Sequence, residues 1–241
     1  MRLLDTSFDS PAENLAFDEV LLNSVEDGNG HETLRFWESP VPFVVLGVGQ
    51  SFRQEVRDRA CLADGIPVLR RCSAGGCVLQ GPGCLNFSLV LSRENHPQLQ
   101  TIRGSYCYIL GLIGEAIETL GVRARHKGTC DLAVRGKKVS GNAQKRRRHS
   151  ILHHGTLVYA VDVSLMTKYL REPVDRPQYR GQRTHRGFVR SLPLDPADLR
   201  NAIAHAFGAR GKPRPPRARE LREMRRLARE KYESLTWIRR R

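Results

Sequence analysis

The sequence lacks the features that would place it in a membrane, secreted or zinc-binding class. No apolar stretch approaches the roughly 18 residues needed to span a bilayer, and the amino terminus turns polar too soon for a secretory signal. None of the six cysteines forms a C-x-x-C pair, and no pair of histidines follows at the spacing of zinc ligands. We therefore expect a cytoplasmic protein with reduced, mostly buried thiols.

Negative charge is scarce relative to positive charge. The 241 residues include 40 lysines and arginines against 25 acidic residues, which gives a formal net charge of +15. Such an excess indicates an anionic partner, which is a nucleic acid, an acidic protein or a phosphate-bearing ligand. The excess is concentrated at Lys145–Arg148 and between Arg210 and Arg241. No cluster of aromatic residues that would stack on bases accompanies these charges, so a nucleic-acid-binding protein is only a remote alternative.

Apolar periodicity predicts helices and strands without a regular strand–helix–strand repeat. Ser10, Pro11 and Glu13 match a capping box, and apolar residues then recur at helical spacing up to Glu26. Further helices are expected at 101–120, 166–170, 196–207 and 218–232, with a short one through Val56 and Ala60; strands are expected at 33–38, 43–46, 66–71, 85–91 and 151–161, with a hairpin around Arg135-Gly136. The stretch 171–185 is predicted to be an irregular surface loop. This order favours an α+β fold with a mixed, largely antiparallel sheet and packed helices.

A first candidate site is the run Arg70-Arg71-Cys72-Ser73-Ala74-Gly75-Gly76. Two arginines at a strand end, followed by a glycine-rich turn, can direct guanidinium groups and backbone N–H groups at one anion. A carboxylate or a phosphate fits such a site. The alternative is a tight hairpin with two solvated arginines.

A second candidate site is the run from Asp131 to Gln144, which contains G-K-K-V-S-G-N-A-Q. Lys138 and Ser140 are two residues apart, so they point the same way if this run is a strand. Asp131, across the expected hairpin, pairs with Lys138 or helps to hold a divalent cation. A lysine between apolar neighbours offers a point charge to a carboxylate or an α-phosphate. The alternative is a surface hairpin with an exposed lysine pair.

The third candidate is His153-His154-Gly155-Thr156. Paired histidines can act as a general base or as metal ligands. On a strand, however, adjacent residues face opposite sides, so both histidines cannot easily bind one ion. A partly buried histidine with a structural hydrogen bond is the alternative.

Together these motifs resemble a known family. The order R-R-x-S-x-G-G, G-x-x-N-F-S, D-L with G-K-K-V-S-G-N-A-Q, and H-H-G-T-L is similar to the lipoate–protein ligase A family of the biotin/lipoate ligase superfamily. The resemblance covers roughly Leu3 to Leu192. It implies a biotin/lipoate ligase-like catalytic domain over residues 1–210. Residues 211–241 are then expected to form a proline-rich linker and a basic helix, without a large accessory domain.

The resemblance also implies a mechanism. Lipoate or octanoate would react with ATP and Mg²⁺ to give an acyl adenylate, and the acyl group would pass to a lysine of a lipoyl carrier domain. Lys138 matches the family's invariant lysine, which contacts the acyl carbonyl and the α-phosphate. Asp131 matches the acidic residue near the metal and the phosphates. The residues that match the acyl and adenylate pocket are Arg70, Arg71, Ser73, Gly75, Gly76, Ser140, Gly141, Asn142, Ala143, His154, Gly155 and Thr156.

Several departures from the family pattern keep other functions open. Ala74 replaces a usual glycine, Cys84 stands where asparagine is common, and Cys130 stands where asparagine or serine often precedes the aspartate. A form without an accessory domain is expected to need a second polypeptide for activation, or to catalyse transfer alone. The main alternative is an octanoyltransferase that works without ATP through a cysteine thioester or a preformed adenylate; Cys130, Cys72 and Cys77 are the candidate nucleophiles, and none stands at the expected place. A biotin–protein ligase is disfavoured because its G-R-G-R-x-G-R loop is absent.

Overall fold

The computed structural model describes residues 1–241. The strands are β1 (Arg2–Asp5), β2 (Thr33–Trp37), β3 (Phe43–Leu46), β4 (Val68–Arg70), β5 (Val78–Gln80), β6 (Cys84–Ser92), β7 (Arg125–Lys127), β8 (Asp131–Val134), β9 (Lys137–Arg146) and β10 (Ser150–Val158). The helices are α1 (Pro11–Glu26), α2 (Phe52–Glu55), α3 (Asp58–Ala63), α4 (Ile102–Thr119), α5 (Val163–Tyr169), α6 (His185–Phe188), α7 (Pro196–Ala206), α8 (Ala218–Leu227) and α9 (Leu235–Ile238). None of these helices is both long and apolar enough to cross a membrane.

The strands form two sheets. The larger sheet has seven strands in the order β1-β2-β6-β10-β9-β8-β7, and the smaller has three in the order β4-β3-β5. Only the pairs β1–β2 and β3–β4 are parallel, and the other six pairs are antiparallel. The predicted α+β class with a mixed, largely antiparallel sheet is therefore confirmed.

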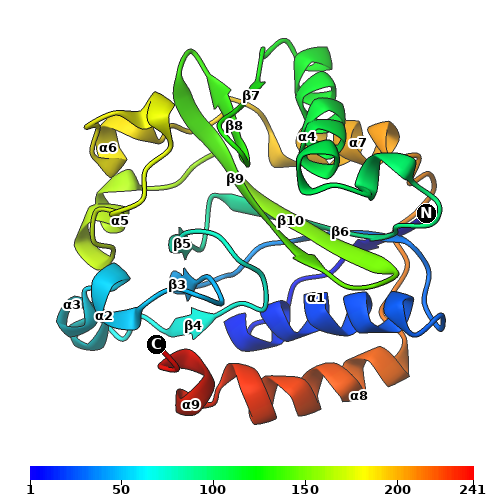
Figure 1. Cartoon of the computed structure of the whole chain (residues 1–241), viewed down its shortest axis with the longest axis horizontal. Coiled ribbons are helices and arrows are strands. Elements are labelled where there is room, and N and C mark those ends of the chain that lie inside the picture. The colour runs from blue at the N-terminus through cyan, green and yellow to red at the C-terminus, as the bar shows by residue number, and fades with distance from the viewer.

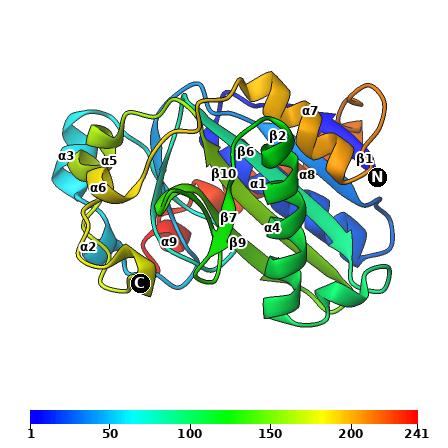
Figure 2. The same cartoon turned by 90° about the horizontal axis from the view of Figure 1, so that it is seen from above.

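The larger sheet lies between two layers of helices (Figure 1). Helices α4 and α7 cover one face, where Ile109 and Ile113 pack with Leu199 and Ile203 in one apolar cluster. Helices α1 and α8 and the small sheet cover the other face with a second cluster. Seen from above in Figure 2, α4 lies in front of β6 and β10, and α1 and α8 lie behind them. Each fully buried aliphatic side chain stabilises the fold by about 1.5–3 kcal/mol, so both faces contribute to the core.

Helix α1 is enclosed by the sheet on one side and by α8 on the other. For this reason it buries polar as well as apolar residues, and Asn14, Asp18 and Glu19 are at most 5% exposed. Buried polar groups are costly unless they are hydrogen-bonded, and all three have partners. The helix thus carries charged groups into the centre of the molecule.

The segment 211–241 packs against the rest of the chain. The Arg2 guanidinium pairs with the Glu220 carboxylate at 2.5 Å. Tyr232 is fully buried, and its hydroxyl donates to Glu19 of α1 at 2.7 Å. Met224, Tyr232 and Ile238 belong to the same apolar cluster as α1. The basic segment and the amino-terminal helix therefore share one core.

Most expected elements are present, with three differences. The helix beyond Gly49 is divided into α2 and α3 because Val56 is extended and bridges to Leu170. The short strands β1 and β7 at the two edges of the sheet were not predicted. The stretch 171–185, predicted to be irregular, contains a helical turn at Gln178–Arg180 and the start of α6.

Candidate active site

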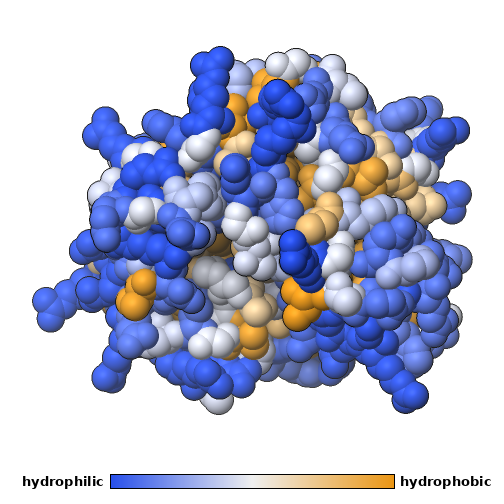
Figure 3. All heavy atoms as spheres, turned by 45° about the horizontal axis from the view of Figure 1, so that its top comes forward, coloured by the Kyte–Doolittle hydropathy of each residue, from blue (hydrophilic) through white to orange (hydrophobic).

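One cavity of about 440 Å³ lies between the small sheet, the strands β6, β9 and β10, and the segment Arg171–Val189. Its volume is in the range of small-molecule sites. Apolar side chains of its wall include Leu15, Trp37, Val45, Leu79, Phe87, Val158 and Met166. Hydrophilic residues dominate the molecular face in Figure 3, and a recess opens near its middle. The cavity therefore offers an apolar interior within a polar surface.

The fold brings the three sequence motifs to this one cavity. The predicted residues that line it are Arg71, Gly76, Asp131, Lys138, Ser140, Gly141, Asn142, Ala143, His154, Gly155 and Thr156. Ser73 and Gly75 lie directly behind this lining, in the loop that carries Arg71. Arg70 does not line the cavity.

Lys138 and Asp131 form an ion pair in the cavity wall. The Lys138 Nζ lies 2.7 Å from the Asp131 Oδ1, and the two side chains are 26% and 5% exposed. A register shift between Leu132 and Ala133 places Asp131 opposite Gly141. A Cβ at Gly141 would lie 2.7 Å from the Lys138 Nζ, so glycine leaves room for the lysine. The predicted pairing across the hairpin is confirmed.

The second oxygen of Asp131 is also engaged. Tyr179 donates its hydroxyl to the Asp131 Oδ2 at 2.8 Å. Burial and the neighbouring Asp131 carboxylate raise the pKa of Tyr179. No group of three or more metal-ligating side chains occurs in the chain. Each oxygen of Asp131 thus accepts one hydrogen bond, from Lys138 or from Tyr179, so in this arrangement Asp131 is engaged as the partner of Lys138.

Arg71 is held by its own loop. Its Nε donates to the Ser73 Oγ at 2.9 Å, and its Nη2 donates to the carbonyl oxygens of Ala74 and Gly76 at 2.7 and 2.9 Å. Its Nη1 has no partner in the protein. Burial lowers the pKa of Arg71, yet an arginine remains charged at neutral pH. The loop therefore leaves one guanidinium nitrogen for a ligand.

The tight approach of two loops makes glycine necessary beside Arg71. Gly75 has a φ of +95°, and a Cβ there would lie 2.9 Å from the Arg71 Nη2. A Cβ at Gly47 would lie 2.0 Å from the Gly75 carbonyl oxygen. The Gly47 turn thus supports the loop from outside the cavity.

Arg70 has a different place from the one predicted. Its side chain is fully buried and does not line the cavity. Its guanidinium donates to the carbonyl oxygens of Gly47 and Gln50 at 2.8 and 2.7 Å and of Trp237 and Ile238 at 3.1 and 2.8 Å. Since these carbonyl groups use its donors, Arg70 is not available to a substrate anion, and we remove it from the set of substrate-binding residues.

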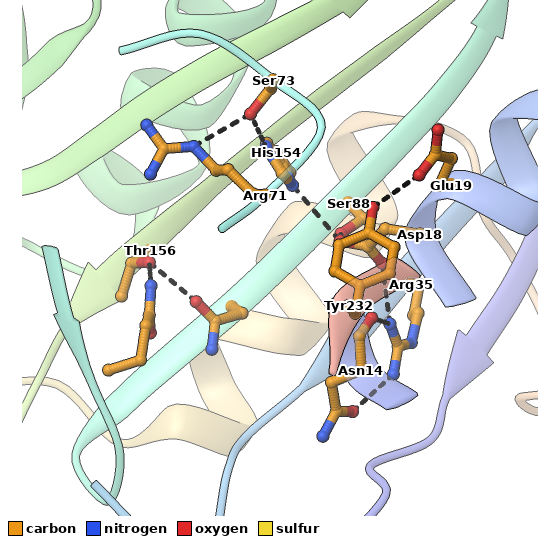
Figure 4. A network of polar contacts seen from close by, with 12 residues as sticks. Asn14, Asp18, Glu19, Arg35, Arg71, Ser73, Ser88, His154, Thr156 and Tyr232 are labelled. Carbon is orange, nitrogen blue, oxygen red and sulfur yellow. Dashed lines mark hydrogen bonds and ion pairs between the residues drawn. The ribbon is translucent and has the colours of Figure 1, made fainter. Parts of the chain in front are cut away.

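His154 joins the Arg71 loop to α1 (Figure 4). Its Nε2 lies 2.6 Å from the Ser73 Oγ, and its Nδ1 lies 3.3 Å from the Asp18 Oδ2. The Asp18 Oδ1 accepts from the Arg35 Nη1 at 2.7 Å. Burial alone would raise the pKa of Asp18, but the Arg35 charge and the hydrogen bond from His154 hold it below its usual value. Asp18 of α1 and Arg35 of β2 were not predicted, because a charged residue in a helix or a strand is usually read as exposed.

His153 lies on the opposite face of β10, as the strand pattern predicted. It is fully buried, and its Nδ1 lies 3.0 Å from the Gln144 Nε2. Burial lowers its pKa to about 3, so this imidazole is neutral. The two histidines therefore share no ion, and only His154 faces the cavity.

Three buried polar atoms of cavity-lining residues have no partner within the protein. They are the Trp37 Nε1, the Gln80 Oε1 and the Asn142 Oδ1. An unpaired buried polar atom costs about 1–3 kcal/mol, and such atoms are often completed by a ligand or by water. Thr156 connects Gln80 to Asn86 through hydrogen bonds of 2.6 and 2.7 Å. The cavity wall thus combines apolar side chains with polar atoms that can bond to a ligand.

Two of the candidate nucleophiles line the cavity. Cys77 and Cys130 belong to its wall, whereas Cys72 does not. Burial raises the pKa of both lining thiols; Asp131 raises that of Cys130 further, and Lys138 opposes this effect. All six cysteines are free, as expected.

The segment Arg171–Val189 covers the cavity, a feature that the sequence analysis missed. Arg171, Arg176 and Arg180 line the cavity from this segment. The Arg180 Nη2 pairs with the Glu172 Oε2 at 2.6 Å. The density of arginines in this stretch was the available signal, but its lack of periodicity suggested a surface loop.

Sequence comparisons identify the family. The family profile "Lipoyl protein ligase A/B catalytic domain" matches residues 10–207. A protein of Aeropyrum pernix assigned to lipoate-protein ligase A is 30% identical over 197 residues, 82% of this chain and 69% of that protein. The octanoyltransferase LipM of Carboxydothermus hydrogenoformans is 34% identical over 187 residues, 70% of this chain and 69% of that protein.

Solved structures show the same fold. A bipartite lipoate protein ligase of Thermoplasma acidophilum, studied with its E2 lipoyl domain, superposes with a TM-score of 0.86 at 24% identity, over 99% of this chain and 95% of that one. A lipoate-protein ligase A bound with ATP gives a TM-score of 0.85 at 23% identity, over 99% and 98% of the two chains. The chain belongs to the lipoyl protein ligase A/B catalytic domain family, whose members include lipoate ligases and octanoyltransferases.

Proposed function

We propose that this protein is a lipoate–protein ligase, which activates lipoate or octanoate with ATP and transfers the acyl group to a lysine of a lipoyl carrier domain. The observation that supports this proposal best is one cavity that has apolar walls and two cations, Arg71 and Lys138. An acyl chain suits the apolar walls, and a carboxylate and a phosphate suit the cations.

In the first step, a carboxylate oxygen of the acid attacks the α-phosphorus of ATP, and pyrophosphate leaves. In the second, the carrier lysine attacks the acyl carbonyl carbon, and AMP leaves. The acyl adenylate is itself activated, so no protein nucleophile is needed, and positioning and charge stabilisation suffice. Lys138 would contact the acyl carbonyl and the α-phosphate in both steps. Arg71 would hold the phosphate through its free Nη1.

Asp131 would position Lys138 rather than bind metal directly. It lies 2.7 Å from the Lys138 Nζ and is fixed by Tyr179 on its other side. Mg²⁺ would enter with the phosphates of ATP as part of the substrate. The orphan Asn142 Oδ1 and the backbone around Gly76 offer polar contacts to the adenylate.

The partners follow from the same proposal. The solved relative of Thermoplasma acidophilum is a bipartite ligase studied with a lipoyl domain. We infer that this chain also acts on a lipoyl carrier domain, and that a second polypeptide supplies the activation of free lipoate if the chain alone cannot. We expect this reaction in the cytoplasm.

A second candidate is an octanoyltransferase, which the presence of Cys130 in the cavity wall favours. Its thiolate would attack the octanoyl thioester of acyl carrier protein and release that carrier's thiolate. The lysine of the lipoyl domain would then attack the new thioester and release the Cys130 thiolate. Burial of the thiol disfavours the thiolate, which makes this candidate second to the ligase.

The test is acylation of an apo lipoyl domain, followed by intact mass. Purified protein is supplied with lipoate and ATP-Mg²⁺, with synthetic lipoyl-AMP, or with octanoyl acyl carrier protein. We expect a lipoyl adduct that depends on ATP and is unchanged in Cys130→Ser. An octanoyl adduct that forms without ATP and disappears in Cys130→Ser would show that the protein is a transferase and not a ligase. An adduct from lipoyl-AMP alone would show transfer without activation, and no adduct in any arm would contradict both candidates.

A further inference from the structure

A chain of buried hydrogen bonds runs from α1 to the cavity cation Arg71. It links Arg35, Asp18, His154, Ser73 and Arg71 through contacts of 2.7, 3.3, 2.6 and 2.9 Å (Figure 4). Arg35, Asp18 and Ser73 are fully buried. The residues come from β2, α1, β10 and the loop after β4, so four separated parts of the sequence build it.

With a neutral imidazole at His154, the donors and acceptors in this chain have only one consistent order. The Asp18 carboxylate can only accept, so the Nδ1 of His154 carries the proton. The Nε2 of the neutral imidazole is then an acceptor, and the Ser73 hydroxyl donates a hydrogen bond to it. The Ser73 Oγ keeps its lone pairs for the Nε–H of Arg71. Each step fixes the direction of the next.

The same geometry argues against a nucleophilic role for Ser73. An acid, a histidine and a serine in this order resemble a hydrolytic triad. Ser73, however, is fully buried, does not line the cavity, and already accepts from Arg71. A nucleophile must reach its substrate, and this hydroxyl cannot. The chain of contacts is therefore better suited to orientation.

We propose that Asp18 is a positioning residue, which fixes the tautomer of His154 and thereby the orientation of the Arg71 guanidinium toward the substrate phosphate. The role of the phosphate rests on the proposed ligase function, whereas the tautomer and the orientation do not. Ser88 also helps to fix the Asp18 carboxylate, because its hydroxyl donates to the Asp18 Oδ2 at 2.7 Å. With the Nε and Nη2 of Arg71 occupied, only Nη1 is left for the ligand.

The variant Asp18→Asn reverses the contacts of the Oδ2 position with His154 and Ser88 with little change in shape. The amide oxygen must face Arg35, whose buried charge needs an acceptor. The amide NH₂ then meets the His154 Nδ1 as a donor, so the imidazole proton must move to Nε2. The Ser73 Oγ would then accept hydrogen bonds from both His154 and Arg71, and the Ser73 hydroxyl hydrogen would have no acceptor. The orientation of Arg71 should loosen.

The first readout needs no activity. Long-range ¹H–¹⁵N spectra of histidine side chains, with His154→Gln used for assignment, should show the Nδ1–H tautomer in the wild type and the Nε2–H tautomer in Asp18→Asn. Exchange of the Arg71 Nε–H with solvent should be faster in Asp18→Asn and in Ser73→Ala. A wild type with the proton on Nε2, or an Arg71 Nε–H that exchanges equally in all variants, would overturn the proposal.

The second readout is a double-mutant cycle on the affinity for lipoyl-AMP, measured by calorimetry. Loss of a hydrogen bond that orients a charged group costs about tenfold in affinity, which we expect for Ser73→Ala. In an Arg71→Ala background the same change should cost about twofold or less, because coupled residues are not additive. An equal loss in both backgrounds would show that Ser73 acts without Arg71.

Two controls separate the possible failures. Glu19→Gln removes the neighbouring buried carboxylate of α1, whose partners are Lys231 and Tyr232, and should leave the His154 tautomer and the Arg71 exchange unchanged. If Asp18→Asn does not fold, Ser73→Ala still tests the link, because it leaves the pair of Asp18 and Arg35 intact. If the wild type does not bind lipoyl-AMP, the proposed function fails, while the tautomer measurement still decides the positioning role.

Discussion

Arg71 and Lys138 supply positive charge to one cavity in two different ways. Arg71 is 7% exposed, and its contacts are with its own loop. The Lys138 side chain is 26% exposed, and its ion-pair partner is Asp131, which depends on Tyr179 of the covering segment. The fold therefore fixes one cation, while the other can exchange its partner for a substrate oxygen. The proposed two-step reaction would gain from this difference, because Arg71 would hold the adenylate while Lys138 follows the moving charge.

Removing Lys138, the cation that can exchange its ion-pair partner, should have the largest effect. We expect Lys138→Ala to lower acyl transfer by about 10³-fold, because preorganised charge at the reacting centre contributes on this scale. The control Lys127→Ala removes an exposed lysine of β7 and should leave the rate unchanged. Circular dichroism checks that both variants fold. Activity of Lys138→Ala near that of the wild type would contradict the proposed site.

Changing Arg71, the cation that its own loop holds in place, should have the next largest effect. Arg71→Lys keeps the charge but loses the planar fork that bonds Ser73, Ala74 and Gly76 together. We expect a loss of about 10²-fold in kcat/KM for the adenylation step, measured by pyrophosphate exchange. If Arg71→Lys is fully active, charge alone matters at this position and the two cations do not differ as described.

The neighbouring Arg70 should affect stability more than chemistry. Arg70→Ala removes the hydrogen bonds from the guanidinium to five backbone carbonyl groups and opens a cavity beside Trp237. We expect the free energy of unfolding to fall by about 3 kcal/mol, measured by urea denaturation. Arg53→Ala, an exposed arginine of α2, should change it by less than about 0.5 kcal/mol. Unchanged stability of Arg70→Ala would remove the distinction between the two adjacent arginines.

The buried histidine behind the cavity predicts a smaller, pH-dependent effect. The pKa of His153 is about 3 in the folded protein, below its usual value of 6.5. The unfolded state therefore binds a proton that the folded state does not, and stability falls as the pH drops below 6.5. Between pH 7 and pH 5 we expect His153 to cost about 2 kcal/mol. Urea midpoints at both pH values should show a smaller drop in His153→Gln; an equal drop would contradict this assignment.

The smallest predicted effect concerns carrier docking. Arg135 and Lys137 are exposed at the tip of the hairpin that carries Lys138, and neither has an acidic partner. We expect the double charge reversal Arg135→Glu, Lys137→Glu to raise the KM for the lipoyl domain several-fold at low salt and less at high salt. The matched reversal of Arg222 and Arg225 on the distant α8 should leave this KM unchanged. Equal effects of both pairs would indicate general charge attraction rather than docking at this tip.

The sequence predicted the fold class and eleven of the residues that line the cavity, for clear physical reasons. Periodic apolar residues define α1 and α4, and the glycine-rich turns fix the loop and hairpin that reach the cavity. The pairing of Asp131 with Lys138 followed from the expected hairpin. The three motifs meet because each lies on a strand or strand end beside the same cavity.

The remaining features depend on tertiary structure. Arg70 and Arg71 are equivalent in sequence, but side chains of adjacent residues point in opposite directions, and only the fold decides which one faces the cavity. Asp18 looked like a polar position of an amphipathic helix, although α1 is covered on both sides. The edge strands β1 and β7 are too short to show alternation, and the arginines of 171–185 have no period.

The Arg70 contacts also have a consequence for the synthesis of the chain. Two of the carbonyl groups that accept hydrogen bonds from this guanidinium belong to Trp237 and Ile238. These residues follow Arg70 by 167 and 168 positions in the sequence. Until residue 238 has left the ribosome, the Arg70 guanidinium at the root of the Arg71 loop lacks the acceptors of its Nε and Nη2, which favours an open structure. A nascent chain can therefore assemble its sheet early and still not assemble its Arg71 loop. A premature stop in the carboxy-terminal segment should yield protein that folds in part but lacks an ordered Arg71 loop.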